Sequence, residues 1–112
     1  MGEKGAKLSS DAAQSYERVI ESLHPLGDMT GKKMFGGYGI FESGTMFALV
    51  NSEGKVFFKV DDSNRWRFEE AGADRHLRMP YYQVPDAILR DEESLFEWAR
   101  ESIELAHKSK KT

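Results

Sequence analysis

The sequence contains no cysteine and no apolar run that approaches the roughly 20 residues needed to cross a bilayer. The absence of thiols excludes disulfides, zinc–thiolate sites and cysteine nucleophiles. The first ten residues include lysines but no apolar segment, so they do not match a signal peptide, and we expect a cytoplasmic protein. The formal net charge is only −3, which provides no global basic field, and direct binding of nucleic acid is therefore not expected.

Groups of residues that carry recognised chemistry are also missing. The histidines His24, His76 and His107 lie far apart, and neither their spacing nor any acidic loop matches a metal site. The pair Asp61 and Asp62 is better explained as a helix cap than as a magnesium site, and no serine lies in a nucleophile elbow. We therefore predict a non-enzymatic protein that uses no metal and no cofactor.

Apolar periodicity predicts an α+β domain, in which helices pack against an antiparallel sheet of about four strands in the order α-βββ-α-β-α. Short, turn-rich connections require the first three strands to be antiparallel neighbours. We expect a flexible arm over residues 1–9, a single domain over residues 10–108 and a frayed tail over residues 109–112. The expected helices cover residues 11–24, 62–71 and 91–107, with a helical turn over 86–89, and the expected strands cover residues 33–41, 46–50, 55–60 and 78–83.

Three glycines interrupt the aromatic first strand, which reads Lys33-Met-Phe-Gly-Gly-Tyr-Gly-Ile-Phe41. Glycine weakens a strand, so this pattern predicts a bulge, a sharp coil of the sheet, or the close approach of another backbone or a ligand. The stretch matches neither a phosphate-binding loop nor the position of an RNA-recognition strand. We expect a bend with positive φ at Gly37, where a β-branched residue would be strongly destabilising.

The most basic and aromatic segment of the chain allows two interpretations. Its arginines could contact phosphates while its rings stack on bases, as in proteins that bind single strands. Alternatively Trp66 and Phe68 pack, and the arginines pair in solvent with Glu69, Glu70 and Asp74, which base rates for exposed charge favour. The residues concerned are Arg65, Arg67, Arg75, His76 and Arg78, with Trp66, Tyr81 and Tyr82 among them.

Six stretches, taken in order, resemble one known family. Together they span about residues 12–105, and they resemble the N-terminal domain of the TfoX/Sxy family, which are bacterial regulators of natural competence. The stretches are Lys33-Met-Phe-Gly-Gly-Tyr-Gly-Ile-Phe41, Met46-Phe-Ala-Leu-Val50, Phe57-Phe-Lys-Val-Asp-Asp62, Arg65 with Phe68-Glu-Glu-Ala-Gly72, Met79-Pro-Tyr-Tyr-Gln-Val-Pro85 and Trp98-Ala-Arg100.

The resemblance implies an antiparallel α+β fold and a cytoplasmic role in transcriptional control. Family members of the competence type are thought to act as co-regulators with the cyclic-AMP receptor protein, so a protein partner of that kind is implied. They have no established enzymatic site, and no catalytic residue can be carried over. Those members carry a second, helical domain after this one. The present sequence departs from that pattern because it ends after the first domain, so we expect a single-domain member of the family.

We therefore predict a non-enzymatic protein-interaction module that contributes to transcriptional regulation through protein partners. Tyrosine and arginine dominate binding hot spots, because they bury a large area and still form hydrogen bonds. The alternatives are direct nucleic-acid binding through the segment Arg65–Arg78 and an unrecognised small-ligand-binding protein. A second copy of the chain, in a homodimer, is a further candidate partner. The candidate partner-binding residues are Tyr38, Arg65, Arg67, Tyr81 and Tyr82.

Overall fold

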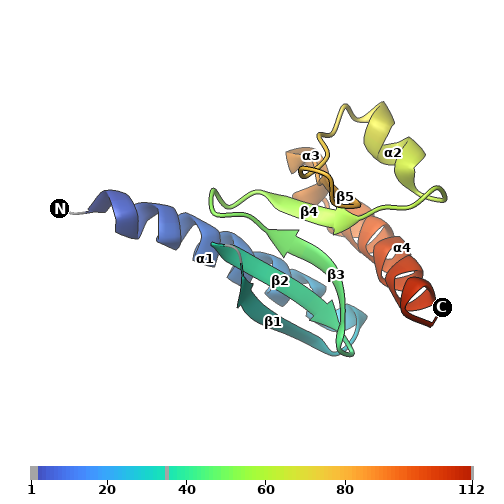
Figure 1. The fold of residues 1–112 in the computed structure, drawn as a ribbon, viewed down its shortest axis with the longest axis horizontal. Coiled ribbons are helices and arrows are strands. Elements are labelled where there is room, and N and C mark those ends of the chain that lie inside the picture. Colours follow the sequence, from blue (N-terminus) through green and yellow to red (C-terminus); the bar gives the residue numbers. More distant parts are fainter. Residues whose placement is uncertain (1–2, 35, 112) are drawn as a thin grey trace.

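A computed structural model describes residues 3–34 and 36–111 of the chain (Figure 1). Within these residues, five antiparallel strands form one sheet in which each strand pairs with its neighbour along the chain. The predicted α+β class is confirmed, although the sheet has five strands instead of four. The elements are α1 (Glu3–Leu23), η1 (His24–Leu26), β1 (Met29–Met34), β2 (Gly37–Glu42), β3 (Thr45–Val50), β4 (Val56–Lys59), α2 (Arg65–Glu70), β5 (Tyr81–Gln83), α3 (Asp86–Leu89) and α4 (Glu92–Lys111).

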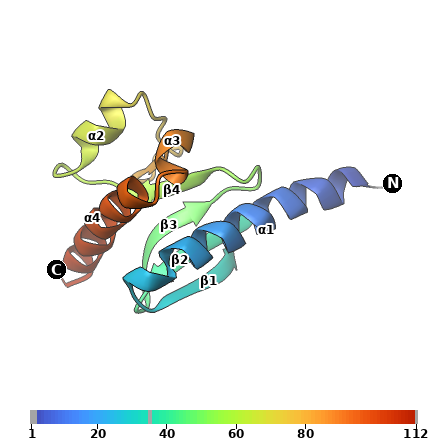
Figure 2. The same ribbon diagram turned by 180° about the vertical axis from the view of Figure 1, so that it is seen from behind.

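Both long helices cover the same face of the sheet. α1 packs on β1 and β2, whereas α4 packs on β3 and β4, and Figure 2 shows both helices in front of the strands. Each helix places an apolar stripe against the sheet, and the burial of these stripes is the main source of stability. The core cluster between the layers includes Leu23, Ile40, Phe47, Phe58, Phe68 and Trp98.

The glycine-rich stretch forms a hairpin, whereas the sequence predicted a single strand. β1 ends at Met34, β2 begins at Gly37, and these two residues are paired in register. Gly36 has a φ of 77°, the left-handed conformation that glycine adopts without steric penalty. The predicted positive φ thus lies at Gly36, and the predicted bulge lies farther along β2, between Ile40 and Phe41.

Gly37 is required for a different reason. A Cβ atom at this position would overlap the carbonyl oxygen of Val50 in β3. The close approach of another backbone was one of the predicted explanations for the glycines, and it is confirmed here. β3 is the central strand, paired with β2 on one side and β4 on the other, so its backbone has no freedom to retreat.

Several predicted boundaries differ from the structure. α1 begins at Glu3, so the arm predicted over residues 1–9 is helical from that residue onward, and α4 continues to Lys111, through most of the predicted tail. α2 begins only at Arg65, and no side chain caps it. Asp61 instead holds the preceding turn, where its Oδ1 accepts hydrogen bonds from the backbone N–H and the hydroxyl of Ser63. The predicted helical turn at Asp86–Leu89 is confirmed.

Glu42 ties the end of β2 to the C-terminal part of α4. Its Oε1 accepts a hydrogen bond from His107 Nε2 at 2.7 Å, and its Oε2 accepts from the hydroxyl of Ser43 at 2.8 Å and from the backbone N–H of Asp28 at 3.3 Å. The hydrogen bond from His107 is the main cause that lowers the pKa of the Glu42 carboxyl below its ordinary value of 4.5. The charged carboxylate is thus better stabilised in the folded chain than in the unfolded one.

This pairing predicts a pH-dependent contribution to stability. A carboxyl whose pKa is lowered on folding stabilises the fold above its ordinary value of 4.5 and loses that contribution as the pH falls through its folded pKa. At neutral pH, Glu42→Gln should lower the free energy of unfolding by about 1 to 2 kcal/mol, measured by urea denaturation. The difference from wild type should shrink in acid. Glu104→Gln, at an exposed position of α4, is the control, and equal effects of the two changes would contradict the prediction.

Candidate functional site

The five predicted partner-binding residues do not form one surface. Tyr38 lies on the helix-covered face of the sheet, where its ring stacks on Tyr16 of α1 with centroids 4.2 Å apart and planes only 7° from parallel. Tyr38 is half-buried by this contact. One face of its ring is therefore occupied by α1, and the side chain also lines the small hollow beside Met34 and Met79.

Tyr81 and Tyr82 are consecutive in β5 and so point to opposite faces of the sheet. Tyr82 packs on Phe68 of α2, with ring centroids 6.0 Å apart, on the side covered by the helices. Tyr81 lies on the other face, is only 6% exposed, and its burial raises the pKa of its hydroxyl to about 12. Tyr81 is therefore buried on one face of the sheet, whereas Tyr82 is half-buried on the other.

The two predicted arginines of α2 have partners within the chain. Arg65 pairs with Asp62 at 2.7 Å. Arg67 lies 3.3 Å from both Glu97 and Glu101 of α4, and its guanidinium carbon is 5.0 Å from the Trp66 ring centroid and 5.4 Å from that of Trp98.

The Arg67 side chain is only 12% exposed, so it fastens α2 to α4. The loop after α2 uses a third arginine in the same way, because the Arg75 guanidinium donates to the carbonyl oxygens of Arg78 and Met79 at 3.0 Å. The arginines pair within the chain, as one interpretation expected, but their partners are Asp62, Glu97, Glu101 and backbone carbonyls instead of Glu69, Glu70 and Asp74. These pairings leave the basic segment with few free guanidinium groups for phosphate. Phe68 is buried as expected, whereas Trp66 is 52% exposed.

The face of the sheet opposite the helices carries a second apolar cluster. Leu49 and Phe57 are opposite each other in β3 and β4, and Tyr81 of β5 packs beside them. Methionines complete the cluster. We call this surface the methionine face and define it as Met34, Met46, Leu49, Phe57, Met79 and Tyr81.

Gly39 explains how the methionines reach the middle of this face. It pairs with Leu49 in the sheet register, so a side chain at this position would point to the methionine face. A Cβ atom there would lie 3.0 Å from the sulfur of Met34 and 3.3 Å from that of Met46. The missing side chain of Gly39 thus leaves a recess, and two flexible thioethers fill it.

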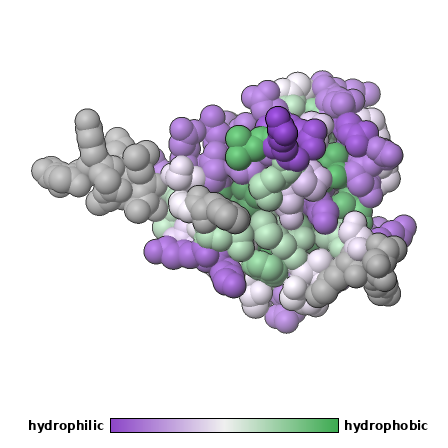
Figure 3. Space-filling view, viewed as in Figure 1, coloured by the Kyte–Doolittle hydropathy of each residue, from purple (hydrophilic) through white to green (hydrophobic). Residues whose placement is uncertain are grey.

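Among the described residues, no helix covers the methionine face (Figure 1). Figure 3 shows the same side of the molecule, with apolar residues gathered over the middle of the sheet and hydrophilic residues around them. A hollow of about 40 Å³ lies there between Met34, Leu49 and Met79, which is too small for a metabolite. This hollow is therefore not a small-molecule site.

The rim of the methionine face is basic. Lys32 is opposite Gly39, and Lys59 is opposite Tyr81, so both lysines share this side of the sheet. The His76 ring packs on Phe57, with centroids 4.8 Å apart. Leu77, the next residue, is 78% exposed and has a φ of 52°, which is uncommon for leucine.

Sequence reasoning missed this surface, because its methionines are far apart in the chain and only the strand pairing brings them together.

In the segments that the structure describes, no three His, Asp or Glu side chains gather where a metal ion could bind. None of the described helices is long and apolar enough to cross a bilayer.

Comparison with known proteins identifies relatives for most of the chain. The family model of the TfoX N-terminal domain matches residues 21–106. The DNA transformation protein TfoX1 of Aliivibrio fischeri is 29% identical over 96 residues, which cover 79% of this chain and 46% of that protein. Protein Sxy of Escherichia coli is 26% identical over 111 residues, which cover 88% of this chain and 52% of that protein.

The chain spans about half the length of the curated relatives that it matches. The family model, by contrast, covers well over half of this chain, from the end of α1 to α4. It therefore includes all five strands and the methionine face that they carry. On this evidence the chain belongs to the TfoX N-terminal domain family, as its sequence motifs predicted.

Proposed function

We propose that this chain is a non-enzymatic protein-interaction module of transcriptional regulation, which acts in the cytoplasm by binding a partner protein through its methionine face. The partner that we propose is the cyclic-AMP receptor protein of the same organism, because the family resemblance implies a co-regulator of that kind. The name of one relative, a DNA transformation protein, supports a competence-type role for the regulation.

The observation that carries the proposal is an apolar sheet face without a covering helix among the described residues. Leu49, Phe57 and Tyr81 are buried within this face, so a partner would contact the half-buried methionines and the exposed Leu77 at the edge. Methionine is flexible and polarizable, so a methionine-lined surface adapts its shape to a partner at little conformational cost. Phe57 and Tyr81 add rigid aromatic area beneath the methionines.

Leu77 gives the proposal a second, independent support. A leucine in a left-handed backbone conformation is strained, and such strain is found most often at functional sites. The residue lies between His76 and Met79, which both contact the methionine face, so the exposed leucine stands at the edge of that face. An exposed leucine held in this way is suited to insert into an apolar pocket of a partner.

The charges around the face indicate the chemistry of the partner surface. Lys32 and Lys59 lie on this side of the sheet, and neither makes an ion pair within the described residues. A complementary partner surface has apolar side chains at its centre and carboxylates at its rim. Such charge complementarity speeds association and selects against wrong partners.

Binding to the purified cyclic-AMP receptor protein tests the proposal. Two variants at exposed positions on the rim of the methionine face, Leu77→Asn and Lys32→Glu, change the binding surface without disturbing the core. Asparagine tolerates the left-handed backbone better than leucine, so the first variant should fold at least as stably as wild type. We expect each variant to weaken binding roughly tenfold in biolayer interferometry.

Matched controls separate this face from the rest of the surface. Trp66→Ala removes another exposed apolar side chain, and Arg100→Glu reverses a charge on α4; both should leave the affinity within about twofold of wild type. Absence of binding by the wild-type chain would reject this partner. Equal losses for the face variants and the controls would reject the methionine face as the binding surface.

A further inference from the structure

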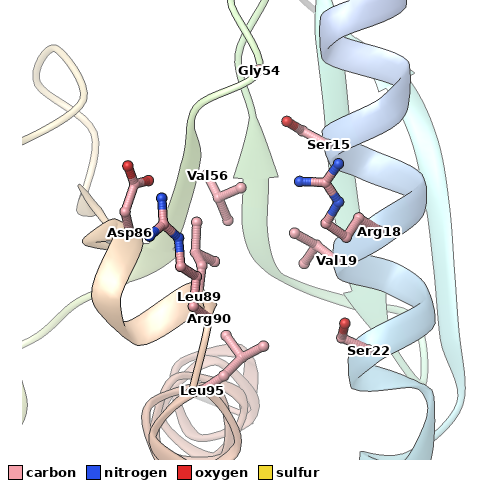
Figure 4. A pocket seen from close by; sticks show the side chains of 10 residues that line it. All are labelled: Ser15, Arg18, Val19, Ser22, Gly54, Val56, Asp86, Leu89, Arg90 and Leu95. Atoms are coloured by element: carbon pink, nitrogen blue, oxygen red, sulfur yellow. The ribbon is translucent and has the colours of Figure 1, made fainter. Parts of the chain in front are cut away.

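A second site lies on the opposite side of the sheet, in a pocket between α1, the turn that joins β3 to β4, and α3. Its volume is about 310 Å³, at the lower end of the range for small-molecule sites. Gly54 closes one end, because the turn approaches α1 so closely that a Cβ atom there would lie 3.0 Å from both the Ser15 hydroxyl and the Asp11 carbonyl oxygen. The pocket is therefore walled by elements from both ends of the chain (Figure 4).

The floor of the pocket is apolar. Val19 of α1, Val56 of β4 and Leu95 of α4 are each at most 5% exposed and belong to the main core. The polar groups stand around the mouth, where α1 contributes the hydroxyls of Ser15 and Ser22. A small apolar body fits such a floor, and the polar rim fixes its orientation.

Two guanidinium groups face this pocket from opposite walls. Arg18 projects from α1 and Arg90 from the end of α3, as Figure 4 shows. Within the described part of the chain neither forms an ion pair, whereas Arg65 and Arg67 both do. Two like charges beside one cavity repel each other, and an anion between them converts that repulsion into two charge-assisted hydrogen bonds.

We propose that this pocket binds a small monocarboxylic acid with a compact apolar body. The carboxylate accepts hydrogen bonds from Arg18 and Arg90, whose planar forks match its geometry, and the apolar body lies on Val19, Val56 and Leu95. Asp86 also lines the pocket beside Arg90, so the local charge is close to +1 and a singly charged ligand is favoured over a doubly charged one. The site is separate from the methionine face and does not depend on the proposed function.

A titration of the full chain followed by heteronuclear NMR tests the inference. The probes are 3-methylbutanoate and benzoate, added at neutral pH up to about 10 mM, the range in which weak binding becomes visible. We expect saturable shifts of backbone amides in α1, α3 and the turn at Gly54. The neutral analogue 3-methylbutanamide should not produce them, because it lacks the charge that the arginines recognise.

Variants assign the binding to the two arginines. Arg18→Gln and Arg90→Gln should each weaken carboxylate binding roughly tenfold, and thermal unfolding should stay near wild type because both side chains are exposed. Arg100→Gln, an exposed arginine of α4 outside the pocket, is the matched control and should bind as wild type does.

Three results with the carboxylates, the amide and the variants would overturn the inference. They are the absence of saturable shifts with either carboxylate, equal shifts with the amide, and variants that bind as tightly as the control. Inorganic phosphate is added as a further probe; binding as tight as that of the carboxylates would show a bare-anion site and would also contradict a monocarboxylate pocket. No partner protein is present in the titration, so its failure would leave the proposed function untouched.

Discussion

Gly37→Val is expected to lower the free energy of unfolding by about 3 to 5 kcal/mol, among the largest effects that one substitution produces. The Cβ atom of valine would overlap the carbonyl oxygen of Val50, which belongs to the central strand. Flexible side chains can move away from a new atom, but a strand held by hydrogen bonds on both sides cannot. Either the β1–β2 hairpin separates from β3 or the strand pairing near Gly37 is lost.

Two further variants show whether this contact is the cause. Gly37→Ala places the same Cβ atom without the β-branch, and most of the loss should remain. Gly44→Ala is the control, because its φ of 83° is left-handed but nothing lies within 4 Å of the added Cβ atom. It should lose only about 1 kcal/mol, the steric cost of a left-handed alanine.

Urea denaturation with all three proteins measures the differences in unfolding free energy. A Gly37→Ala variant as stable as Gly44→Ala would show that the sheet adapts to the new atom. In that case the close approach to Val50 would not be what requires glycine.

The helices were easier to predict from the sequence than the first hairpin. Apolar periodicity indicates the stripe that includes Val19 and Leu23, and it also indicates the face of α4 that carries Leu95 and Trp98; all four residues are in the core. β1 has no such pattern, because it is an edge strand in which residues 30–33 are exposed. A strand whose side chains bury little has no alternation to detect, so the sequence predicted the hairpin as one strand.

The candidate surface was harder to predict, because exposure depends on tertiary contacts that a local pattern does not contain. Tyrosine and arginine are common in binding sites, which made Tyr38 and Arg67 candidates. In the structure, each contacts a residue distant in sequence: Tyr16 stacks on Tyr38, and Glu97 forms an ion pair with Arg67. The methionine face is the reverse case, because no sequence pattern indicated it. Its parts are unremarkable alone and become one surface only when the meander brings Met79 near Leu49.

Asn64→Ala is expected to lower the free energy of unfolding by about 2 to 4 kcal/mol. Asn64 is completely buried, and its side chain faces inward although it precedes α2 at the position where a cap is usual. Its Oδ1 accepts the backbone N–H of Asp61 at 2.8 Å, and its Nδ2 donates to the Lys59 carbonyl at 3.2 Å. The same carbonyl accepts the hydroxyl of Ser102 from α4 at 2.8 Å, so the amide belongs to a network that joins β4, α2 and α4.

Alanine at this position would leave the Asp61 N–H without a partner and would open a small cavity, and each change is destabilising. Asn51→Ala is the matched control, because the Asn51 side chain likewise accepts hydrogen bonds from the backbone. Its Oδ1 accepts the N–H groups of Glu53 at 3.0 Å and Lys55 at 2.8 Å, but it does so in an exposed turn. Water can replace that acceptor, so the control should lose about 1 kcal/mol or less. Equal losses for Asn64→Ala and Asn51→Ala in urea denaturation would show that burial of the amide adds nothing, and that α2 is held in place by its apolar and Arg67 contacts alone.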